Sequence, residues 1–428
     1  MTSMLESNNT FCHINHLPAE ILREIFVLGL SDNTSSKRTR TVSFVCRYWR
    51  LLALEECRLW LEISIELRLS DAPCWSGTDC QAAPVIQSAE LERAALWLSR
   101  SKGAPLILSI SLDRVPEYVH QYVKDLVSPH YHRCKRLELI LDRSDTVENA
   151  RIWLPLPDST FDHLDELYIV TGLTERDRLD LGPPLTLRRL HISTWAAMSF
   201  HPGLRLTDEV LMDRSNFETV SGVLKHCRDV KKINIQSYWW FDPLPALSLP
   251  TLEELTLHLH PSRHSIIRNA PNLRYLDCRG LSATLWELRE LDKSTRSDIL
   301  RVFSGLEVLV IQDPDFHASG HAACFESLRV MRTHRLNDDV IRLLASSSSV
   351  PLPFPALQLL VIHWGASVWY RNGYQPLFEL LWARPTLNLI FDFCNGPPPE
   401  LDCLGNRAQF VENLWEMSTE ELLTRFLC

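Results

Sequence analysis

The sequence lacks the patterns on which most enzymes and membrane proteins depend. Its 428 residues include only 14 glycines, and they contain no Gly-rich phosphate loop, no HExxH and no GxSxG motif. The longest stretch without Asp, Glu, Lys or Arg, Leu343 to Tyr370, is interrupted by four consecutive serines and three prolines, which exclude a membrane-spanning helix. The net charge of −9 disfavours a nucleic-acid-binding protein, which would carry the opposite sign. We therefore expect no catalytic residues, no cofactor, and neither nucleic-acid nor membrane partners.

The twelve cysteines form no pattern that is typical of metal binding. There is no CxxC pair, and the closest cysteines, Cys74 and Cys80, are followed by no histidine pair at ligand spacing. His258, His260 and His264 lie close together, but a proline follows the second one, so a solvated loop cluster is favoured over a metal site. The first ten residues have none of the features of a signal peptide. These observations predict free thiols, no metal, and a cytoplasmic and/or nuclear location.

Two amphipathic helices are predicted near the N-terminus. Pro18 suits the first turn of a helix, and a polar segment from Ser31 to Arg40 separates this helix from the second one. The apolar positions are Ile21, Leu22, Ile25 and Phe26 in the first helix and Val42, Val45, Trp49 and Leu52 in the second, followed by Leu59 and Trp60. A unit of this size can hardly bury so many large apolar side chains internally. The helices therefore either complete an adjacent core or leave apolar surface for a partner.

One short apolar motif recurs through the rest of the chain. It has the form x-Φ-x-x-Φ-x-Φ, where Φ is apolar, and most copies start 20 to 29 residues after the previous one, as leucine-rich repeats do. The copies lie at 163–169, 186–192, 229–235, 251–257, 272–278, 305–311, 327–333 and 356–362, with looser ones at 134–139 and 386–391. The separation of 43 residues between Leu187 and Val230 is wide enough to hide a missed copy.

Each copy predicts a short strand whose apolar positions face one way. Polar residues fill the outward positions of successive copies, such as Lys232 and Asn234, or Glu254 and Thr256, so the other face should contact water. The alternative is a doubly wound α/β domain, which would cover both faces of its sheet. We therefore expect an α/β (α+β) protein in which N-terminal helices precede an irregular leucine-rich-repeat solenoid.

The N-terminal segments LPAEILREIF, SFVCRYWRLLAL and RLW together resemble an F-box. They match its Leu-Pro opening, its Val-Cys-Arg-x-Trp-Arg helix and its closing Leu-Trp in the right order, although the connector from Ser31 to Arg40 is longer than usual. The resemblance implies a three-helix F-box at residues 13–61 that binds a Skp-type adaptor and, through it, a cullin-RING ubiquitin ligase. The residues implied in adaptor binding are Leu17, Pro18, Ile21, Leu22, Ile25, Phe26, Val45, Cys46, Trp49, Leu59 and Trp60.

The order of parts resembles F-box proteins with leucine-rich repeats, in particular the expanded F-box family of mushroom-forming (basidiomycete) fungi. This implies a connector at 62–88, and a repeat solenoid with a C-terminal cap at 89–428. The implied function is substrate recognition in a Skp–cullin–F-box type E3 ubiquitin ligase, by a protein that is monomeric within the complex. The alternative is an interaction scaffold outside any ligase.

The unknown protein substrate is expected on the solvent-exposed face of the repeats. The candidate residues there are Tyr168, His191, Asn234, Thr256 and Asp277, together with Trp239 and Trp240. The two tryptophans belong to an aromatic run that either packs on the edge of the repeats or contacts a partner.

Overall fold

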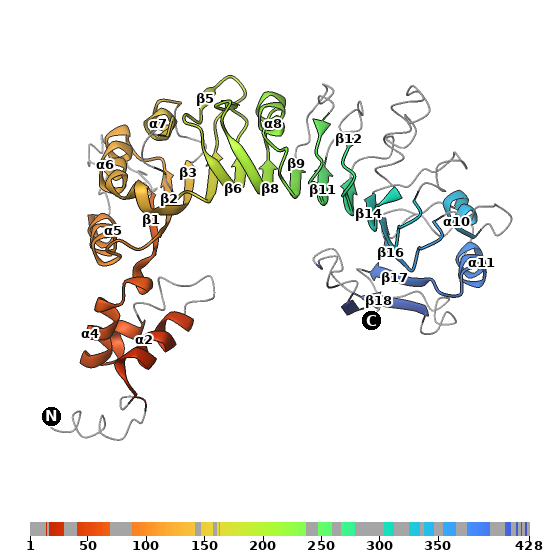
Figure 1. Cartoon of the computed structure of the whole chain (residues 1–428), viewed down its shortest axis with the longest axis horizontal. Coiled ribbons are helices and arrows are strands. Elements are labelled where there is room, and N and C mark those ends of the chain that lie inside the picture. The colour runs from red at the N-terminus through yellow and green to blue at the C-terminus, as the bar shows by residue number, and fades with distance from the viewer. Residues whose placement is uncertain are drawn as a thin grey trace, which may run out of the picture. The chain divides into compact units, whose positions relative to one another are not determined.

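The computed structural model divides the chain into two compact units, Met1–Thr186 and Leu187–Cys428, and both contain parallel strands (Figure 1). The residues that it describes are 14, 17–29, 41–68, 88–141, 147–156, 161, 163–236, 247–258, 267–278, 304–311, 325–333, 338–345, 354–364, 375–393, 407–411, 417, 421 and 424–425. Over these residues, the helices are all too short or too polar to span a bilayer.

The first unit begins with short helices, as the apolar spacing predicts. They are α2 (Ala19–Leu28), a helical turn at residues 41–45, α4 (Arg47–Glu55) and the 3₁₀-helix η3 (Cys57–Trp60). Pro18 precedes α2, and its carbonyl accepts the first helical hydrogen bond, from the Leu22 N–H at 3.1 Å. Cys46 caps α4, since its Sγ accepts from the backbone N–H of Trp49 at 3.5 Å.

A parallel sheet with helices on one face completes the first unit (Figure 1). Its strands pair in the order β1 (Glu62–Arg68), β2 (Leu106–Asp113), β3 (Cys134–Leu141) and β4 (Glu166–Thr171). The other elements are α5 (Ser88–Arg100), α6 (Glu117–Val127), η4 (Ser128–Arg133), α7 (Val147–Trp153) and β5 (Arg178–Asp180).

Strand β1 is a difference from the sequence analysis, which assigned its residues to a connector. The sequence EISIELR alternates apolar and polar residues, and it buries Ile63, Ile65 and Leu67 while Glu62, Glu66 and Arg68 are exposed. Strand β1 pairs in parallel with β2 over its whole length, with Ile63 opposite Leu108. The sheet therefore begins immediately after the N-terminal helices.

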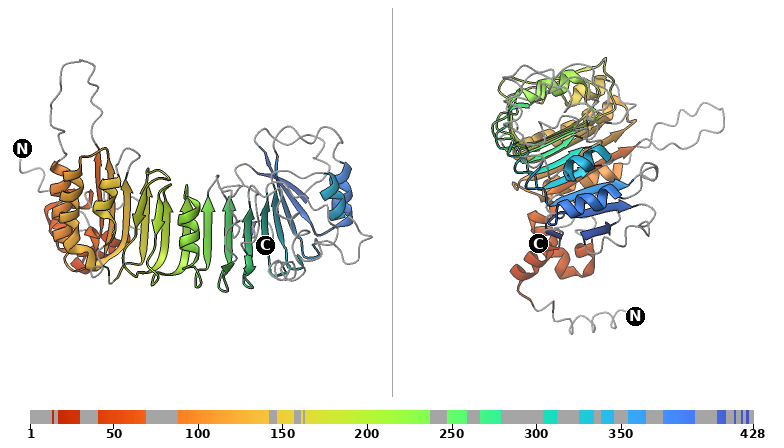
Figure 2. Two further views of the ribbon diagram at one scale, coloured as in Figure 1. Left: turned by 90° about the horizontal axis from the view of Figure 1, so that it is seen from above. Right: turned by 90° about the vertical axis from the view of Figure 1, so that its right-hand side faces the viewer.

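The second unit continues the strand motif. Its elements are β6 (Thr186–Ser193), β7 (Ala197–Ser199), β8 (Arg205–Asp213), α8 (Phe217–Leu224), β9 (Lys232–Gln236), β10 (Leu247–Ser248), β11 (Glu254–His258), β12 (Ile267–Asn269), β13 (Tyr275–Cys278), β14 (Val308–Ile311), β15 (Val330–Thr333), α10 (Asp338–Ala345), β16 (Leu359–Trp364), α11 (Gln375–Ala383), β17 (Asn388–Phe393) and β18 (Ala408–Val411). From β8 to β18 the strands of the main sheet pair in parallel, each with the next in the order β8-β9-β11-β13-β14-β15-β16-β17-β18 (Figure 2).

The recurring motif corresponds to a recurring structure. The first apolar residue of each of the eight copies is at most 3% exposed. Before several strands the N–H of this residue donates to the carbonyl three residues earlier, as Leu252 does to Leu249 and Leu273 does to Ala270. Strand β8 lies in the gap of 43 residues, and its buried Val210 and Met212 lie opposite Ile233 and Ile235 of β9. The wide gap therefore contains a further strand of the main sheet.

The expected solvent-exposed face is present in one part of the second unit and absent in another. In β9 and β11 the residues between the buried positions are exposed or half-buried. In β14 and β15 all four residues are buried, so both faces of these strands are covered. The outward positions of β14 are valines, and such continuous apolar runs are typical of strands that are covered on both sides. The expectation of one solvent-exposed face is therefore wrong for this part of the sheet.

Candidate functional site

The N-terminal helices have a small apolar interior. Leu22 and Phe26 of α2 are buried, and the ring of Phe26 lies 4.9 Å from that of Trp49 on α4. Trp60 is also buried, and its indole N–H donates to the backbone carbonyl of Ala53 at 2.8 Å. These contacts hold α2, α4 and η3 together, so the buried residues determine the fold of the helices.

The outer surface of the same helices is apolar as well. Of the eleven large hydrophobic side chains that are exposed in the described part of the chain, seven lie here, and they are 40% to 72% exposed. They are Ile21, Ile25 and Leu28 on α2, Phe44 and Val45 in the turn before α4, and Tyr48 and Leu51 on α4. Ile21, Ile25 and Leu28 follow one another at intervals of four and three residues, so they form one stripe on α2. An apolar surface of this kind marks a site for a protein partner.

The sequence-predicted adaptor-binding residues divide into three groups. Pro18, Ile21, Ile25 and Val45 are exposed; Leu17, Cys46 and Trp49 are half-buried; Leu22, Phe26, Leu59 and Trp60 are buried. The buried four pack inside the protein, so a partner cannot reach them without unfolding the helices. Four exposed residues were not in the predicted set: Leu28, Phe44, Tyr48 and Leu51. Leu28 carries a signal in the sequence, because it lies seven residues after Ile21 on the same helix.

Ion pairs tie the polar side of α2 to the end of the helical region. Arg58 donates to Glu24 at 2.7 Å and to Glu56 at 2.8 Å, and Arg23 pairs with Glu55 at 2.7 Å. The hydrogen bond from Arg58 lowers the pKa of the buried Glu56 carboxyl below its ordinary value. These pairs fix the orientation of α2, and therefore of its apolar stripe.

Trp60 connects the helices to the following sheet. Its ring lies edge-on to Trp97 of α5 at 5.7 Å, and the guanidinium of Arg100 lies 4.6 Å from its ring centroid. The backbone N–H of Ile107 in β2 donates to the carbonyl of Leu61 at 2.9 Å. The helical region and the first strands are thus joined through side chains and through the backbone.

The expected substrate-facing residues are partly brought together. Asn234, Thr256 and Asp277 occupy matching positions on the neighbouring strands β9, β11 and β13. Asp277 is only 1% exposed, so its prediction as a solvent-facing residue is wrong; the covered face begins at this strand. His191 lies half-buried on β6, and Tyr168 lies half-buried on β4 in the first unit. Trp239 and Trp240 lie outside the described residues.

Charged side chains of both signs surround these positions. Arg189 of β6 pairs with Glu209 of β8 at 3.6 Å, and Lys232 of β9 pairs with Glu254 of β11 at 2.8 Å. Glu254 raises the pKa of Lys232, which favours its charged form. On β3, Arg136 stacks on the Tyr168 ring of β4 at 4.3 Å. Because each sign is neutralised by the other, this surface suits a polar protein better than a polyanion.

The N-terminal helices thus present an apolar stripe on their outer surface. Among the described residues there is no group of three or more His, Cys, Asp or Glu that could bind a metal. Residues 14–66 match the F-box-like family model. The match supports an F-box protein, and F-box domains are in general adaptors that bind Skp-type proteins in cullin-RING ligases, rather than enzymes. A search of curated proteins found no match. The F-box-like domain comprises α2, the helical turn at 41–45, α4, η3 and the first part of β1.

Proposed function

We propose that this protein is the substrate-recognition subunit of a Skp–cullin–F-box type E3 ubiquitin ligase. The observation that carries the proposal is the exposed apolar stripe of Ile21, Ile25 and Leu28 on the F-box-like domain. Burial of such side chains against an adaptor removes apolar surface from water, which is the main driving force of association. The polar side of the domain is engaged in its own ion pairs, through Arg58 and Arg23, and leaves the apolar stripe as the docking element.

The proposed mechanism is proximity, since the ubiquitin-transfer chemistry belongs to other subunits. A substrate held on the same molecule as the adaptor has a high effective concentration at the ligase. The contact between Trp60 and Trp97 supports this mechanism, because it packs the F-box-like domain against α5 in the same compact unit. The proposed location is cytoplasmic and/or nuclear.

The proposed substrate-binding region is the polar sheet face of the second unit, in a solenoid of degenerate leucine-rich repeats. The buried first apolar residue of every motif copy and the turn that precedes several of the strands support the repeat assignment. Asn234 and Thr256 lie on neighbouring strands of this face, with Lys232 and Glu254 beside them. The mixed charges favour a protein partner with polar and charged side chains.

The test is binding of a purified Skp-type adaptor to the full chain with Ile21→Asp and Ile25→Lys. The acidic residue at position 21 lies in the first turn of α2 and the basic residue at position 25 lies in its last turn. Both charges interact favourably with the helix dipole, so α2 itself should tolerate them. Loss of a central apolar anchor typically costs about 2 kcal/mol, so we expect affinity for the adaptor to fall by about 30-fold or more. Isothermal titration calorimetry measures the affinity, and circular dichroism measures the folded fraction.

Leu96→Lys is the matched control, because Leu96 of α5 is 46% exposed and Ile21 is 48% exposed. We expect this variant to bind the adaptor like the wild type, since Leu96 lies outside the F-box-like domain. Undiminished adaptor binding by the folded Ile21/Ile25 variant would contradict the proposal. Co-purification of the adaptor without a cullin would favour the alternative, an interaction scaffold outside the ligase.

A further inference from the structure

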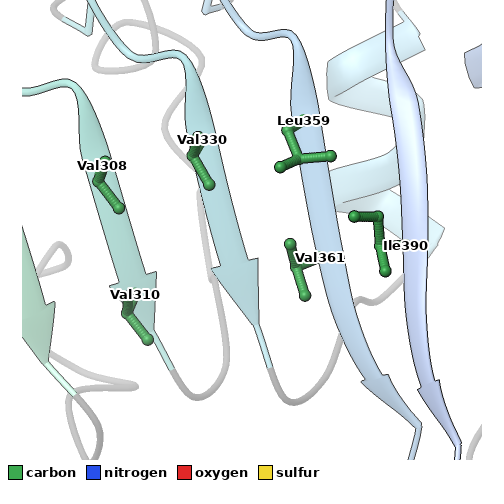
Figure 3. Packing of buried hydrophobic residues seen from close by; sticks show 6 residues of the cluster. All are labelled: Val308, Val310, Val330, Leu359, Val361 and Ile390. Carbon is green, nitrogen blue, oxygen red and sulfur yellow. The ribbon is translucent and has the colours of Figure 1, made fainter. Parts of the chain in front are cut away.

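In the second unit, the strands β14 to β17 carry apolar residues on both faces, and one of these faces lies away from the described helices. In the strands β14 to β17 the residues Leu309, Met331, Leu360 and Leu389 occupy one face, in line with the helix-covered core of the preceding strands. The alternate residues Val308, Val310, Val330, Leu359, Val361 and Ile390 occupy the opposite face. Figure 3 shows these six side chains on the same side of four neighbouring strands.

These six residues are no more than 4% exposed, although they continue the face that carries Asn234 and Thr256 in β9 and β11. On this face, Asp277 of β13 lies opposite Val310 of β14. The next residues in the same row are Arg332 of β15, Val361 of β16 and Ile390 of β17. Apolar side chains on a sheet face become this inaccessible only when another part of the protein lies over them. Part of the chain therefore covers the face.

Met417 is a described part of that cover. Its side chain packs against the cluster of six residues. Its backbone carbonyl accepts a hydrogen bond of 3.2 Å from Nη1 of Arg332, which lies 85 residues earlier in the chain. Arg425 reaches the Met417 sulfur at 4.0 Å, so the C-terminal part of the chain also contacts this position.

The contacts of Met417 show which chemistry this face binds. Arg332 is 2% exposed, and a buried guanidinium needs hydrogen-bond acceptors to offset its lost hydration. A backbone carbonyl is an acceptor that any peptide can supply. The six apolar residues provide a surface of small and branched side chains, and an unbranched methionine adapts to such a surface.

We propose that the face of β14–β17 formed by these six residues and Arg332 is a peptide-docking site, and that the chain's own C-terminal part occupies it through Met417. The occupant places one long apolar side chain, that of Met417, on the valine cluster and one carbonyl on Arg332. In this arrangement the open polar region at β9 and β11 and the occupied apolar region at β14–β17 are two separate parts of one sheet face. A substrate with a similar segment reaches the second surface by displacing Met417.

The first experiment measures access to the face in the full chain. Val310→Cys places a thiol at the centre of the cluster, and cysteine is a small apolar residue that such a site accepts. We expect maleimide to modify Cys at this position at least tenfold faster when Met417→Asp is also present. Met417→Leu is the control, because leucine conserves the volume and should keep the slow rate. Mass spectrometry of the peptide that contains position 310 separates this thiol from the native cysteines.

The second experiment adds a synthetic peptide of residues 411–425 in trans. We expect it to bind the Met417→Asp chain at least tenfold more tightly than the wild-type chain, in which the site is occupied. A peptide that itself carries Met417→Asp should bind neither chain. Equal maleimide rates in the Asp and Leu variants, or equal peptide affinities of the two chains, would overturn the proposal. Adaptor binding through Ile21 and Ile25 should not change in these variants, so the two proposals can fail separately.

Discussion

Neighbouring residues of α2 have different roles. Ile25 is exposed, whereas Phe26 is 3% exposed and its ring lies 4.9 Å from that of Trp49. The F-box pattern in the sequence includes both residues without distinguishing them. A pattern therefore identifies the domain, while the exposed fraction of each side chain distinguishes residues that fold the domain from residues that remain accessible to a partner.

Glu56 is the residue whose ionisation should affect the stability of the F-box-like domain. Its pKa is lowered in the folded state, mainly by the hydrogen bond from Arg58, so its contribution is present above its unfolded value of about 4.5 and is lost as the pH falls through its folded value. We expect Glu56→Gln to be less stable than the wild type at pH 6, and expect this difference to shrink by pH 3. Urea denaturation at both pH values measures the free energy of unfolding.

Glu92→Gln is the control, because Glu92 is exposed on α5 and outside the Arg58 cluster. The control should show the same pH dependence as the wild type. If the Glu56→Gln difference persists unchanged at pH 3, the carboxylate of Glu56 is not the source of the effect.

At the scale of elements, the contact between η3 and α5 joins two parts that the sequence analysis separated by a connector. Trp60 closes the F-box pattern, and Trp97 lies in α5, beyond the predicted connector. Their ring contact and the pairing of β1 with β2 make the helices and the sheet parts of one compact unit. The orientation of the apolar stripe on α2 is thereby coupled to the first strands of the sheet.

A double-mutant cycle tests this coupling. We expect Trp60→Leu and Trp97→Leu to be non-additive by roughly 0.5 to 1.5 kcal/mol, the usual range for an aromatic pair beyond its buried area. Chemical denaturation of the single and double variants gives the free energies of unfolding. A second cycle that combines Trp60→Leu with Trp153→Leu is the comparison. Trp153 is buried in α7, and its indole N–H donates to His120.

The comparison pair, Trp60 and Trp153, should be additive to within about 0.5 kcal/mol. Additivity of the Trp60 and Trp97 pair as well would mean that the ring contact carries no coupling. In that case the contact of Arg100 with Trp60 and the backbone hydrogen bond from Ile107 to Leu61 would connect the helices with the sheet.

At the scale of the whole molecule, the sequence predicted the F-box-like helices and the strands that follow them, and it predicted the surface of the second unit only in part. The F-box pattern and the strand motif depend on local spacing, which one sequence displays directly. The valines of β14, in contrast, belong to a buried cluster that packs against Met417, which is distant in the sequence. The run Val308-Leu309-Val310-Ile311 was a local signal of coverage on both sides, because it contains no polar residue.

The residues of the candidate site could likewise be predicted where local spacing indicates them, but not where they depend on contacts between distant segments. Leu28 and Tyr48 share a helix with predicted residues, so helical spacing could have indicated them. Which of Ile25 or Phe26 faces outward depends on how α2 packs on α4, and this contact spans the polar segment from Ser31 to Arg40. Pairings over such a distance leave no periodic signal in a single sequence.

The cysteines provide a measurement that spans both units. Burial raises the pKa of Cys134 to about 12 and raises the pKa values of Cys227 and Cys278 above their ordinary range. The thiolate is the reactive form, so we expect iodoacetamide at pH 8 to modify these three far more slowly than the half-buried Cys57. Mass spectrometry of tryptic peptides gives each rate, and in urea the rates should converge. Fast modification of native Cys227 or Cys278 would show that the core of the second unit opens readily.

The short distance between Trp60 and β1 limits how this protein can be recombined with others. Only Leu61 lies between them, and its carbonyl is already bonded to Ile107. One residue inserted at this point would turn Ile63, Ile65 and Leu67 toward water, because side chains alternate along a strand. A chimera that exchanges the N-terminal domain must therefore keep the register of β1, and its crossover point belongs before Cys57, where the chain is still outside the sheet.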